Sequence, residues 1–336
     1  MTTAERYSRQ LLFPGIGEEG QRRLKNSRVL IVGMGALGTV LANHVVRAGI
    51  GYTHFVDRDY VELSNLQRQS LFNEDDVSRA LPKAVAAKNT LEKVNTEVEI
   101  DATVCDVHSG NVASFTEDVD IVLDGTDNFH TRFLLNDACF KQQIPLSYGG
   151  VVQAKGVSAL FVPGMTPCLR CFIGEGAQQG ETCDTVGVIA PIVDIIASYQ
   201  VVEVVKYLVG ATEQLRNTVQ TIDIWHNTFS QLSFRAPKVD CATCQKAEYP
   251  ALAERATDTV ALCGRETIQV GGKPLNIAEM ATRLRAVATI QETPFLVRAT
   301  LPEGERLVLF PDGRVLVQGT EDVAKAKSLY NKYIGH

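Results

Sequence analysis

Two pairs of closely spaced cysteines are the strongest chemical signal in the sequence. Cys168 and Cys171 form one C-x-x-C pair, and Cys241 and Cys244 form another. Four thiolates in two such pairs are the ligand set that tetrahedral Zn²⁺ takes in closed, structural sites. Neither pair encloses a histidine, so sulfur would fill all four positions and leave none open for catalysis at the metal. We therefore expect a structural zinc site that joins two distant segments, with two unrelated thiol pairs as the alternative.

A glycine-rich turn between an apolar run and a helical pattern predicts a nucleotide site. Gly33, Gly35 and Gly38 stand in the sequence G-M-G-A-L-G. Glycines at this spacing let backbone N–H groups approach a phosphate at the N-terminus of the following helix. Asp57 ends the next apolar run, where a carboxylate would accept hydrogen bonds from ribose hydroxyls. The alternative is a plain turn from strand to helix.

Basic residues beyond Asp57 favour cleavage of a nucleoside triphosphate over simple binding. Asn65 and Arg68 lie in S-N-L-Q-R-Q, and Lys83 follows. An enzyme that breaks a triphosphate must stabilise charge on the transferred phosphorus and on the leaving pyrophosphate. A nicotinamide enzyme leaves its pyrophosphate intact and needs no such cations. Taken singly, the two basic residues would be surface charges and Asn65 a turn residue, so the prediction rests on their combination.

Three further residues have chemistry that spacing alone leaves open. Asp127, in D-G-T-D-N at the end of another apolar run, could hold Mg²⁺ on a triphosphate or cap the following helix. Arg9 precedes the nucleotide motif and would reach a phosphate only if its segment folded over the site of its own chain or of a partner. Cys183 lies outside both cysteine pairs. A loop thiol can be a nucleophile where positive charge stabilises its thiolate, but Glu181 and Asp184 are negative.

The elements that must position these residues alternate between strands and helices over the first 150 residues. Strands are expected at 28–32, 53–56, 97–102, 121–123 and 145–149, with helices at 36–48, 83–94 and 131–142. Such alternation predicts a parallel, Rossmann-like α/β sheet. Beyond it we expect a hairpin at 151–162, a long loop at 172–190, a helix at 191–209 and a strand pair at 219–235. The sheet would therefore be mixed, parallel in its first half and antiparallel in its second.

The 336 residues predict two domains. The first would span residues 1–250 and contain the motifs above. The second, a small α+β unit over residues 257–336, shows strands at 267–270 and 295–300, helices at 277–287 and 321–333, and a hairpin around Asp312-Gly313. Its sequence does not indicate a function, and the binding of a partner is one role that such a small module could have.

Composition excludes several classes of protein. A net charge of −6 argues against a broad basic surface for nucleic acid. The longest uncharged run, residues 29–46, contains three glycines and reads as strand, turn and helix, so we expect no membrane span. The first residues lack the basic and then apolar pattern of a secretion signal. We therefore expect a cytoplasmic protein whose eight cysteines are not disulfide-bonded.

The order of these motifs resembles that of the ThiF/MoeB/HesA-type adenylyltransferases, the bacterial relatives of ubiquitin-activating enzymes in thiamine and molybdopterin biosynthesis. The motifs are R-Y-S-R-Q, G-M-G-A-L-G, D-R-D, S-N-L-Q-R-Q, P-K, D-G-T-D-N, C-L-R-C, T-C-D and C-A-T-C. The resemblance covers about residues 5–246. The C-terminal unit lies outside it, and it does not resemble the rhodanese domain that some relatives append.

The resemblance implies ATP-dependent activation of a protein carboxylate. The C-terminal glycine of a small ubiquitin-like sulfur carrier, of the ThiS or MoaD type, would attack the α-phosphate of ATP and give an acyl-adenylate and pyrophosphate. A sulfurtransferase would then convert the activated carboxylate to a thiocarboxylate. Family members are homodimers, and the arginine that matches Arg9 comes from the other subunit.

The resemblance also assigns expected roles to single residues. Arg68 and Lys83 would contact the phosphates, Asp127 would assist through Mg²⁺, and Cys183 matches a cysteine that some relatives link to the carrier and others do without. The remaining residues expected at the nucleotide are Gly33, Gly35, Ala36, Gly38, Asp57, Asp59, Asn65 and Asn128. The sequence departs from the family at Ala80 and Leu81, where glycine and glutamine are usual, and this could alter the loop that carries Lys83.

Two alternatives remain open. The same adenylation chemistry could act on a small molecule or on a carboxylate carried by tRNA, although the zinc pairs and the acidic net charge weigh against tRNA. A nicotinamide-dependent oxidoreductase, or a nucleotide-binding scaffold without catalysis, would also use the glycine-rich turn. Neither of these needs Arg68, Lys83 and Asp127 together.

Overall fold

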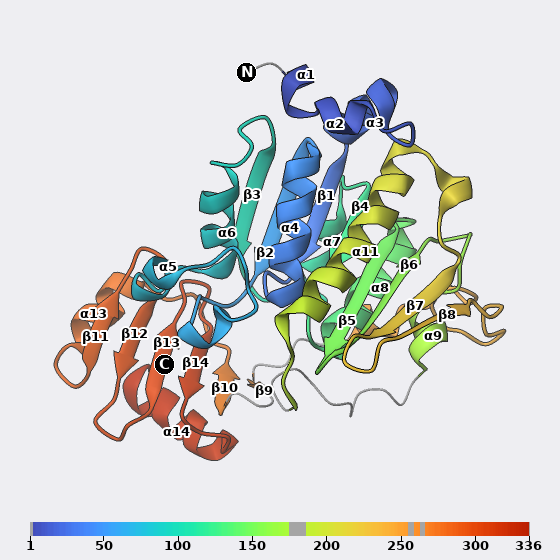
Figure 1. The fold of residues 1–336 in the computed structure, drawn as a ribbon. Coiled ribbons are helices and arrows are strands. Elements are labelled where there is room, and N and C mark those ends of the chain that lie inside the picture. Colours follow the sequence, from blue (N-terminus) through green and yellow to red (C-terminus); the bar gives the residue numbers. More distant parts are fainter. Residues whose placement is uncertain (1–2, 175–185, 255–258, 263–265, 336) are drawn as a thin grey trace. The chain divides into compact units, whose positions relative to one another are not determined.

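The computed structural model describes residues 3–174, 186–254, 259–262 and 266–335 (Figure 1). The chain divides into two compact units, Met1–Glu254 and Arg255–His336. Each unit has its own sheet and is described by itself.

An eight-stranded sheet forms the centre of the first unit, in the order β3-β2-β1-β4-β5-β6-β7-β8. The strands are β1 (Arg28–Val32), β2 (Tyr52–Asp57), β3 (Glu99–Val104), β4 (Ile121–Asp124), β5 (Leu146–Val152), β6 (Lys155–Phe161), β7 (Thr218–Asp223) and β8 (Thr228–Ser233). Pairing is parallel from β3 to β5 and antiparallel from β5 to β8. The predicted mixed sheet is thus confirmed.

Helices cover both faces of this sheet (Figure 1). The longer ones are α3 (Gly17–Asn26), α4 (Ala36–Ala48), α6 (Lys83–Leu91), α8 (Phe129–Gln142) and α11 (Ala190–Val209). The shorter ones are α1 (Thr3–Arg6), α2 (Ser8–Leu11), η1 (Leu63–Asn65), α5 (Glu74–Ser78), α7 (Val112–Thr116), α9 (Leu169–Ile173), η3 (Thr212–Gln214) and α12 (Pro250–Ala253). Helix α11 packs on α3, α4, β5 and β6, whereas α8 packs on α7, α9 and α12. Within the described ranges no helix has both the length and the apolar character that a membrane span requires.

Helix ends follow the local sequence signals closely. Helix α4 spans the predicted residues 36–48 and ends at Gly49, whose φ of 79° is the left-handed conformation that glycine adopts without strain. Helix α11 has a proline in its first turn and ends at Gly210. The long loop expected at 172–190 falls largely outside the described residues, and its ends belong to α9 and α11.

Several predicted boundaries are wrong by two or three residues: the helix predicted at 83–94 ends at Leu91, the strand predicted at 97–102 is Glu99–Val104, and the helix predicted at 277–287 ends at Leu284. A further wrong boundary concerns β5. The sequence suggests a strand at 145–149 followed by a separate hairpin, but β5 continues through Gly149 and Gly150 to Val152 and is itself the first arm of that hairpin. In the sequence, Gly149 and Gly150 suggest that the strand ends there, because glycine weakens the interior of a strand. Here the reason for glycine is packing, because a Cβ on Gly149 would lie 2.1 Å from the side-chain oxygen of Gln200 on α11.

The second unit is a six-stranded antiparallel sheet in the order β11-β12-β13-β14-β10-β9. Its elements are β9 (Thr259–Leu262), β10 (Thr267–Val270), α13 (Ile277–Leu284), β11 (Thr289–Glu292), β12 (Val297–Thr300), β13 (Arg306–Leu309), β14 (Val315–Gln318) and α14 (Val323–Tyr333). Apolar residues of α13 and α14 share a core with one face of the sheet. The predicted α+β class and the β13–β14 hairpin are confirmed, while β9 and β11 were not expected.

Candidate functional site

Two loops pack against each other at the carboxyl ends of β1 and β4. The N–H of Gly33 donates to the carbonyl of Val56 and that of Gly125 to the carbonyl of Val32, both at 2.8 Å. A Cβ on Gly38 would lie 1.8 Å from the carbonyl oxygen of Gly33, so this contact requires glycine. Above Gly35 the space is open with respect to the described residues, of which only Gln69, through Nε2 at 4.0 Å, approaches the position of a Cβ. The turn, which leads into α4 at Ala36, has the close packing below and the free space above that a phosphate cradle needs.

Asp57, at the end of β2, holds this glycine-rich turn directly. Its Oδ2 accepts from the N–H of Met34 at 2.6 Å, and its Oδ1 accepts from the N–H of Asp59 at 2.6 Å. Burial raises the pKa of Asp57, although the nearby charge of Lys83 acts in the opposite direction. The carboxylate predicted to bind ribose therefore also orders the loop beside the nucleotide position.

Lys83 is a buried cation at the first residue of α6, with 3% of its surface exposed. Its Nζ donates to Asp59 Oδ2 at 3.3 Å, and its backbone N–H donates to the carbonyl of Asp59 at 2.9 Å. A buried ammonium needs such a partner, because desolvation otherwise disfavours the charged form. The turn before Lys83 contains Ala80 at a φ of 46°, which gives a physical reason for the glycine that is usual there.

The segment of Asn65, Arg68 and Gln69 lies next to the same turn. Asn65 is buried, and its Oδ1 accepts from the N–H of Glu62 at 3.0 Å as part of the cap of η1. Arg68 is half-buried and donates to the carbonyl of Ser64. Gln69 is 3% exposed, and its Oε1 has no hydrogen-bond partner within the described part of the chain. Gln69 is the last residue of the S-N-L-Q-R-Q motif, and its type and spacing alone indicate no role. Because its buried amide lies beside Gly35, Gln69 is a further candidate for contact with the nucleotide.

The loop of Asp127 and Asn128 follows β4. The side chain of Asn128 accepts from the N–H of Thr131 at 2.9 Å and caps α8, so the alternative that Asp127 forms this cap is wrong. Asp127 lies exposed just before the cap. It is therefore at the same edge of the sheet as the glycine-rich turn, with its carboxylate accessible.

Arg132, which sequence reasoning missed, fixes the backbone of this loop from α8. Its Nε donates to Asp124 Oδ2 at 3.2 Å, and its Nη2 donates to the carbonyls of Thr126 and Gly149 at 2.7 and 3.0 Å. The guanidinium lies between the rings of Phe129 and Tyr148, 5.2 Å from each centroid. Burial raises the pKa of Asp124, an effect that the neighbouring guanidinium opposes. No spacing rule would have indicated an ion pair that joins a strand end to a helix.

Arg9 does not lie at this edge. It is exposed on α2. Gln10 of α2 donates to the carbonyl of Ala48, the last residue of α4, and Arg6 of α1 donates to that of Val94, just beyond α6. Both short helices are therefore attached at the C-terminal ends of α4 and α6, away from the glycine-rich turn. Since α4 has 13 residues, its two ends are about 20 Å apart. Figure 1 shows α1–α3 and α5 at opposite ends of β1 and β2. Arg9 thus lies far from the nucleotide loops of its own chain. Cys183 is outside the described residues.

A pocket of about 410 Å³ opens on the antiparallel half of the sheet. It is lined by residues 153–155, residues 186–189, and Asp223, Trp225 and His226. Because β5 runs parallel to β1 and the later strands alternate in direction, the β5–β6 and β7–β8 turns lie at the same edge as the nucleotide loops. A hydrogen bond from His226 lowers the pKa of Asp223. Trp225 is 71% exposed and offers an apolar surface at the mouth.

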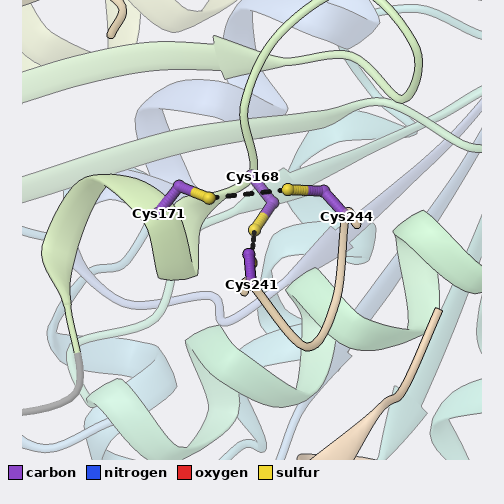
Figure 2. Close-up of side chains that lie close together, drawn as sticks. All are labelled: Cys168, Cys171, Cys241 and Cys244. Carbon is purple, nitrogen blue, oxygen red and sulfur yellow. Dashed lines mark hydrogen bonds between the residues drawn. The ribbon is translucent and has the colours of Figure 1, made fainter. Parts of the chain in front are cut away.

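The four paired cysteines meet in one cluster, as predicted (Figure 2). Their Sγ atoms all lie within 4.8 Å of one another, and the Cys168–Cys241 and Cys171–Cys244 pairs are each 3.5 Å apart. Four sulfurs bound tetrahedrally to one Zn²⁺ would be about 3.8 Å apart, so the arrangement fits this ion.

Burial and hydrogen bonding shift the pKa values of three of the four clustered thiols. Burial raises the pKa of Cys168, and it raises that of Cys171 to about 11. Burial also acts to raise the pKa of Cys241, but hydrogen bonds from the Cys244 N–H and the neighbouring thiols outweigh it, and the pKa is lowered. A divalent cation would hold all four as thiolates.

The comparisons with known proteins agree with this geometry. The ThiF family matches residues 7–243. The chain is similar to a sulfur carrier protein ThiS adenylyltransferase of Bacillus subtilis (strain 168), with 42% identity over 98% of this chain and 99% of the relative. It is also 34% identical to an adenylyltransferase and sulfurtransferase MOCS3 of Aedes aegypti, over 88% of this chain and 66% of that protein.

Among solved structures, the chain resembles E. coli MccB with succinimide. The TM-score is 0.62 and the identity 25%, over 71% of this chain and 74% of that one. The similarity agrees with the predicted Rossmann-like adenylation fold. Because the family matches well over half of the chain, and a relative is similar along nearly its whole length, the protein belongs to the ThiF family.

Proposed function

We propose that this protein is an adenylyltransferase that uses ATP to activate the C-terminal glycine of a small ubiquitin-like sulfur carrier. The observation that carries the proposal is the chain of contacts from Met34 through Asp57 and Asp59 to Lys83, which holds a buried cation beside an open glycine-rich turn. A site that only binds a dinucleotide needs no such cation, whereas departure of pyrophosphate does. The relative from Bacillus subtilis, named for activation of ThiS, supports the same chemistry.

In the proposed reaction, a carboxylate oxygen of the carrier attacks the α-phosphorus of ATP. The bond between the α-phosphorus and its bridging oxygen breaks, and pyrophosphate leaves with the electron pair. Backbone N–H groups of the glycine-rich turn would hold the phosphates, and Asp57 and Asp59 would bind the ribose. Lys83 and Arg68 would stabilise charge on the phosphates, and Asn65 and Asn128 would line the site. Asp127 would hold Mg²⁺, which supplies further positive charge there.

The pocket near Trp225 is the position that we propose for the C-terminal tail of a protein substrate. It opens at the same edge of the sheet as the nucleotide loops and is bordered by two hairpin turns. On the adjoining strand β8, Phe229 and Leu232 are exposed large apolar residues. An extended tail ending in glycine could lie in the pocket and reach the α-phosphate while the body of the carrier contacts β8.

The position of Arg9 supports a homodimer. Since this side chain lies at the edge opposite its own nucleotide loops, it would act on a phosphate only in a second copy of the chain. A sulfurtransferase would be the partner that consumes the acyl-adenylate, in line with the double name of the relative from Aedes aegypti. Cys183 stays a candidate for a covalent link to the carrier. We place these reactions in the cytoplasm.

The four clustered cysteines would hold Zn²⁺ in this protein. With four sulfur ligands the ion would supply a structural link between the segment of α9 and the segment before α12.

ATP–pyrophosphate exchange tests the proposal. We expect exchange that depends on a carrier ending in Gly-Gly, that stops when the last glycine is deleted, and that falls strongly in Asp127→Ala. The matched control is Glu117→Ala. Glu117 is an exposed acid that precedes β4 in the chain, whereas Asp127 follows β4, and this variant should show normal ATP–pyrophosphate exchange. Exchange driven by a small carboxylic acid without carrier would favour the small-molecule alternative. Binding of NADH without binding of ATP would overturn the proposal.

A further inference from the structure

Two adjacent residues of α8, Asn136 and Asp137, are completely buried, although both are polar and one is charged. Neither belongs to a motif that the sequence analysis singled out, and neither lies in the nucleotide loops. Buried polar side chains are costly unless they are hydrogen-bonded. Their partners therefore indicate what they do.

Asp137 binds both cysteine loops with the two oxygens of one carboxylate. Its Oδ1 accepts from the hydroxyl of Thr243 at 2.7 Å, and its Oδ2 accepts from Arg170 Nη2 at 3.1 Å. Arg170 lies between Cys168 and Cys171, and Thr243 lies between Cys241 and Cys244. The N–H of Ala251 also donates to Oδ2, at 2.9 Å. One carboxylate thus joins the inner residues of both pairs and the segment that follows the second pair.

Asn136 adds hydrogen bonds to the first cysteine loop and to Asp137 itself. Its Oδ1 accepts from the N–H of Leu169 at 2.9 Å, which is the other inner residue of the first pair. Its Nδ2 donates to Asp137 Oδ1 at 3.0 Å and so orients that carboxylate. Arg170 Nε in turn donates to the Thr243 hydroxyl at 3.3 Å, which closes the network between the two loops. Of the four inner residues, three are held by hydrogen bonds from a single turn of α8.

We infer that Asn136 and Asp137 are positioning residues for the metal centre, and that they gather the four thiols around the place of a thiophilic divalent cation before the cation binds. Two loops about 70 positions apart in the chain must otherwise be ordered by the ion alone, as in small zinc domains that are unfolded without metal. Hydrogen bonds that order the loops in advance reduce this cost and raise metal affinity. The inference concerns the metal centre and does not rest on the proposed adenylylation.

The same helix connects the cluster to the nucleotide loops. Asn128 caps the first turn of α8, and Asn136 follows it by about 12 Å along the axis. The hydrogen bonds of Asn136 and Asp137 to the cysteine loops therefore also hold α8 in place. This helix carries Arg132, and the loop of Asp127 precedes it. A packing role alone would stabilise α8 without changing the affinity of the thiols, and this difference can be measured.

The test is the zinc affinity of the full chain, measured by competition with a chromophoric chelator. We expect Asp137→Asn, which keeps the size of the side chain but places an amide against the guanidinium and N–H donors, to weaken binding by about 10- to 100-fold. The Co²⁺-loaded variant should show weaker d–d and thiolate charge-transfer bands. The matched control is Asp76→Asn, a buried carboxylate that bonds the backbone N–H of Asn73 and touches neither cysteine loop. It should bind zinc like the parent protein.

A milder variant keeps the test valid if Asp137→Asn does not fold. Thr243→Val removes one hydroxyl at nearly constant volume and should weaken zinc binding by about 2- to 10-fold, the value of one hydrogen bond. Unchanged zinc affinity and Co²⁺ spectra in both variants would overturn the inference. So would a variant whose metal-free and metal-loaded forms lose equal stability, because the side chains would then serve packing only.

Discussion

Asp57 and Met34 are joined by a hydrogen bond of 2.6 Å from the backbone N–H of Met34 to the carboxylate of Asp57. It links the end of β2 to the glycine-rich turn after β1. The second oxygen of Asp57 accepts from the N–H of Asp59, so the carboxylate orders two loops at once. Any substitution of Asp57 should therefore act on the shape of the phosphate cradle as well as on a direct contact with ribose.

Asp57→Asn tests this double role. An amide group would set an N–H against the N–H of Met34 or of Asp59, and one loop would lose its anchor. Hydrogen bonds to charged groups contribute about 1.5–3 kcal/mol, so ATP affinity should fall by about 10- to 100-fold in calorimetric titrations. Asp101→Asn, at a strand position bonded to Tyr52, is the control and should bind ATP normally. Equal ATP affinity in Asp57→Asn would contradict the assignment.

Lys83 should affect the rate of pyrophosphate exchange and the stability of the protein separately. Lys83→Met removes the cation and leaves Asp59 without this partner, so we expect exchange to fall by about 10²- to 10³-fold and stability to drop as well. The double variant Asp59→Asn/Lys83→Met removes both charges. It should recover most of the stability and none of the exchange rate. Recovery of exchange in the double variant would show that Lys83 serves only to pair with Asp59.

Arg132→Lys should destabilise the first unit while preserving its charge. Arg132 contacts Asp124 through Nε and the carbonyls of Thr126 and Gly149 through Nη2, and the single Nζ of a lysine cannot occupy both positions. Breaking a buried ion pair costs about 3–5 kcal/mol. Urea unfolding should show a loss toward the lower end of that range, since one charged contact can remain. Arg28→Lys, an exposed arginine that bonds the carbonyl of Asp118, should change the free energy of unfolding by under about 1 kcal/mol.

The stability of the protein should fall on acidification because of His54. Burial lowers the pKa of this imidazole below its usual 6.5, so the unfolded chain takes up the proton more readily than the folded one. The contribution of neutral His54 to the free energy of unfolding is complete above pH 6.5. It is lost as the pH falls from 6.5 toward the pKa of His54 in the folded protein. His54→Gln should remove up to about 1.4 kcal/mol per pH unit from the slope of the unfolding free energy in this window. Identical slopes for parent and variant in urea titrations would contradict the assignment.

Metal analysis should find about one zinc per chain, since the four clustered thiols make one site. Cys244→Ser should lower this ratio severalfold and lower the temperature of unfolding, because the link between the two loops is lost. The control is Cys105→Ser, a half-buried cysteine outside the cluster, which should keep its metal. Full zinc content in Cys244→Ser would show that the metal binds elsewhere.

The nucleotide motifs could be assigned from the sequence because they depend on short-range geometry. The glycines of the turn, the helix at 36–48 and its stop at Gly49 follow from backbone sterics within a few residues. Cysteine spacing works in the same way, since each C-x-x-C pair presents two thiols on one loop. Even Ala80, a departure from the family, lies at a left-handed φ that explains the usual glycine.

The parts that sequence reasoning missed depend on partners far away in the chain. Asp137 bonds Arg170, Thr243 and Ala251, and Arg132 bonds the carbonyl of Gly149. Asp137 looks like an ordinary helical acid until the fold buries it. The sequence was thus enough for the turns, the repeated spacings and the class of chemistry, which follow from local sterics and ligand preference. The pairing of buried charges, and the distance of Arg9 from its own nucleotide loops, required the packed structure, because burial turns a polar side chain into one that must find a partner.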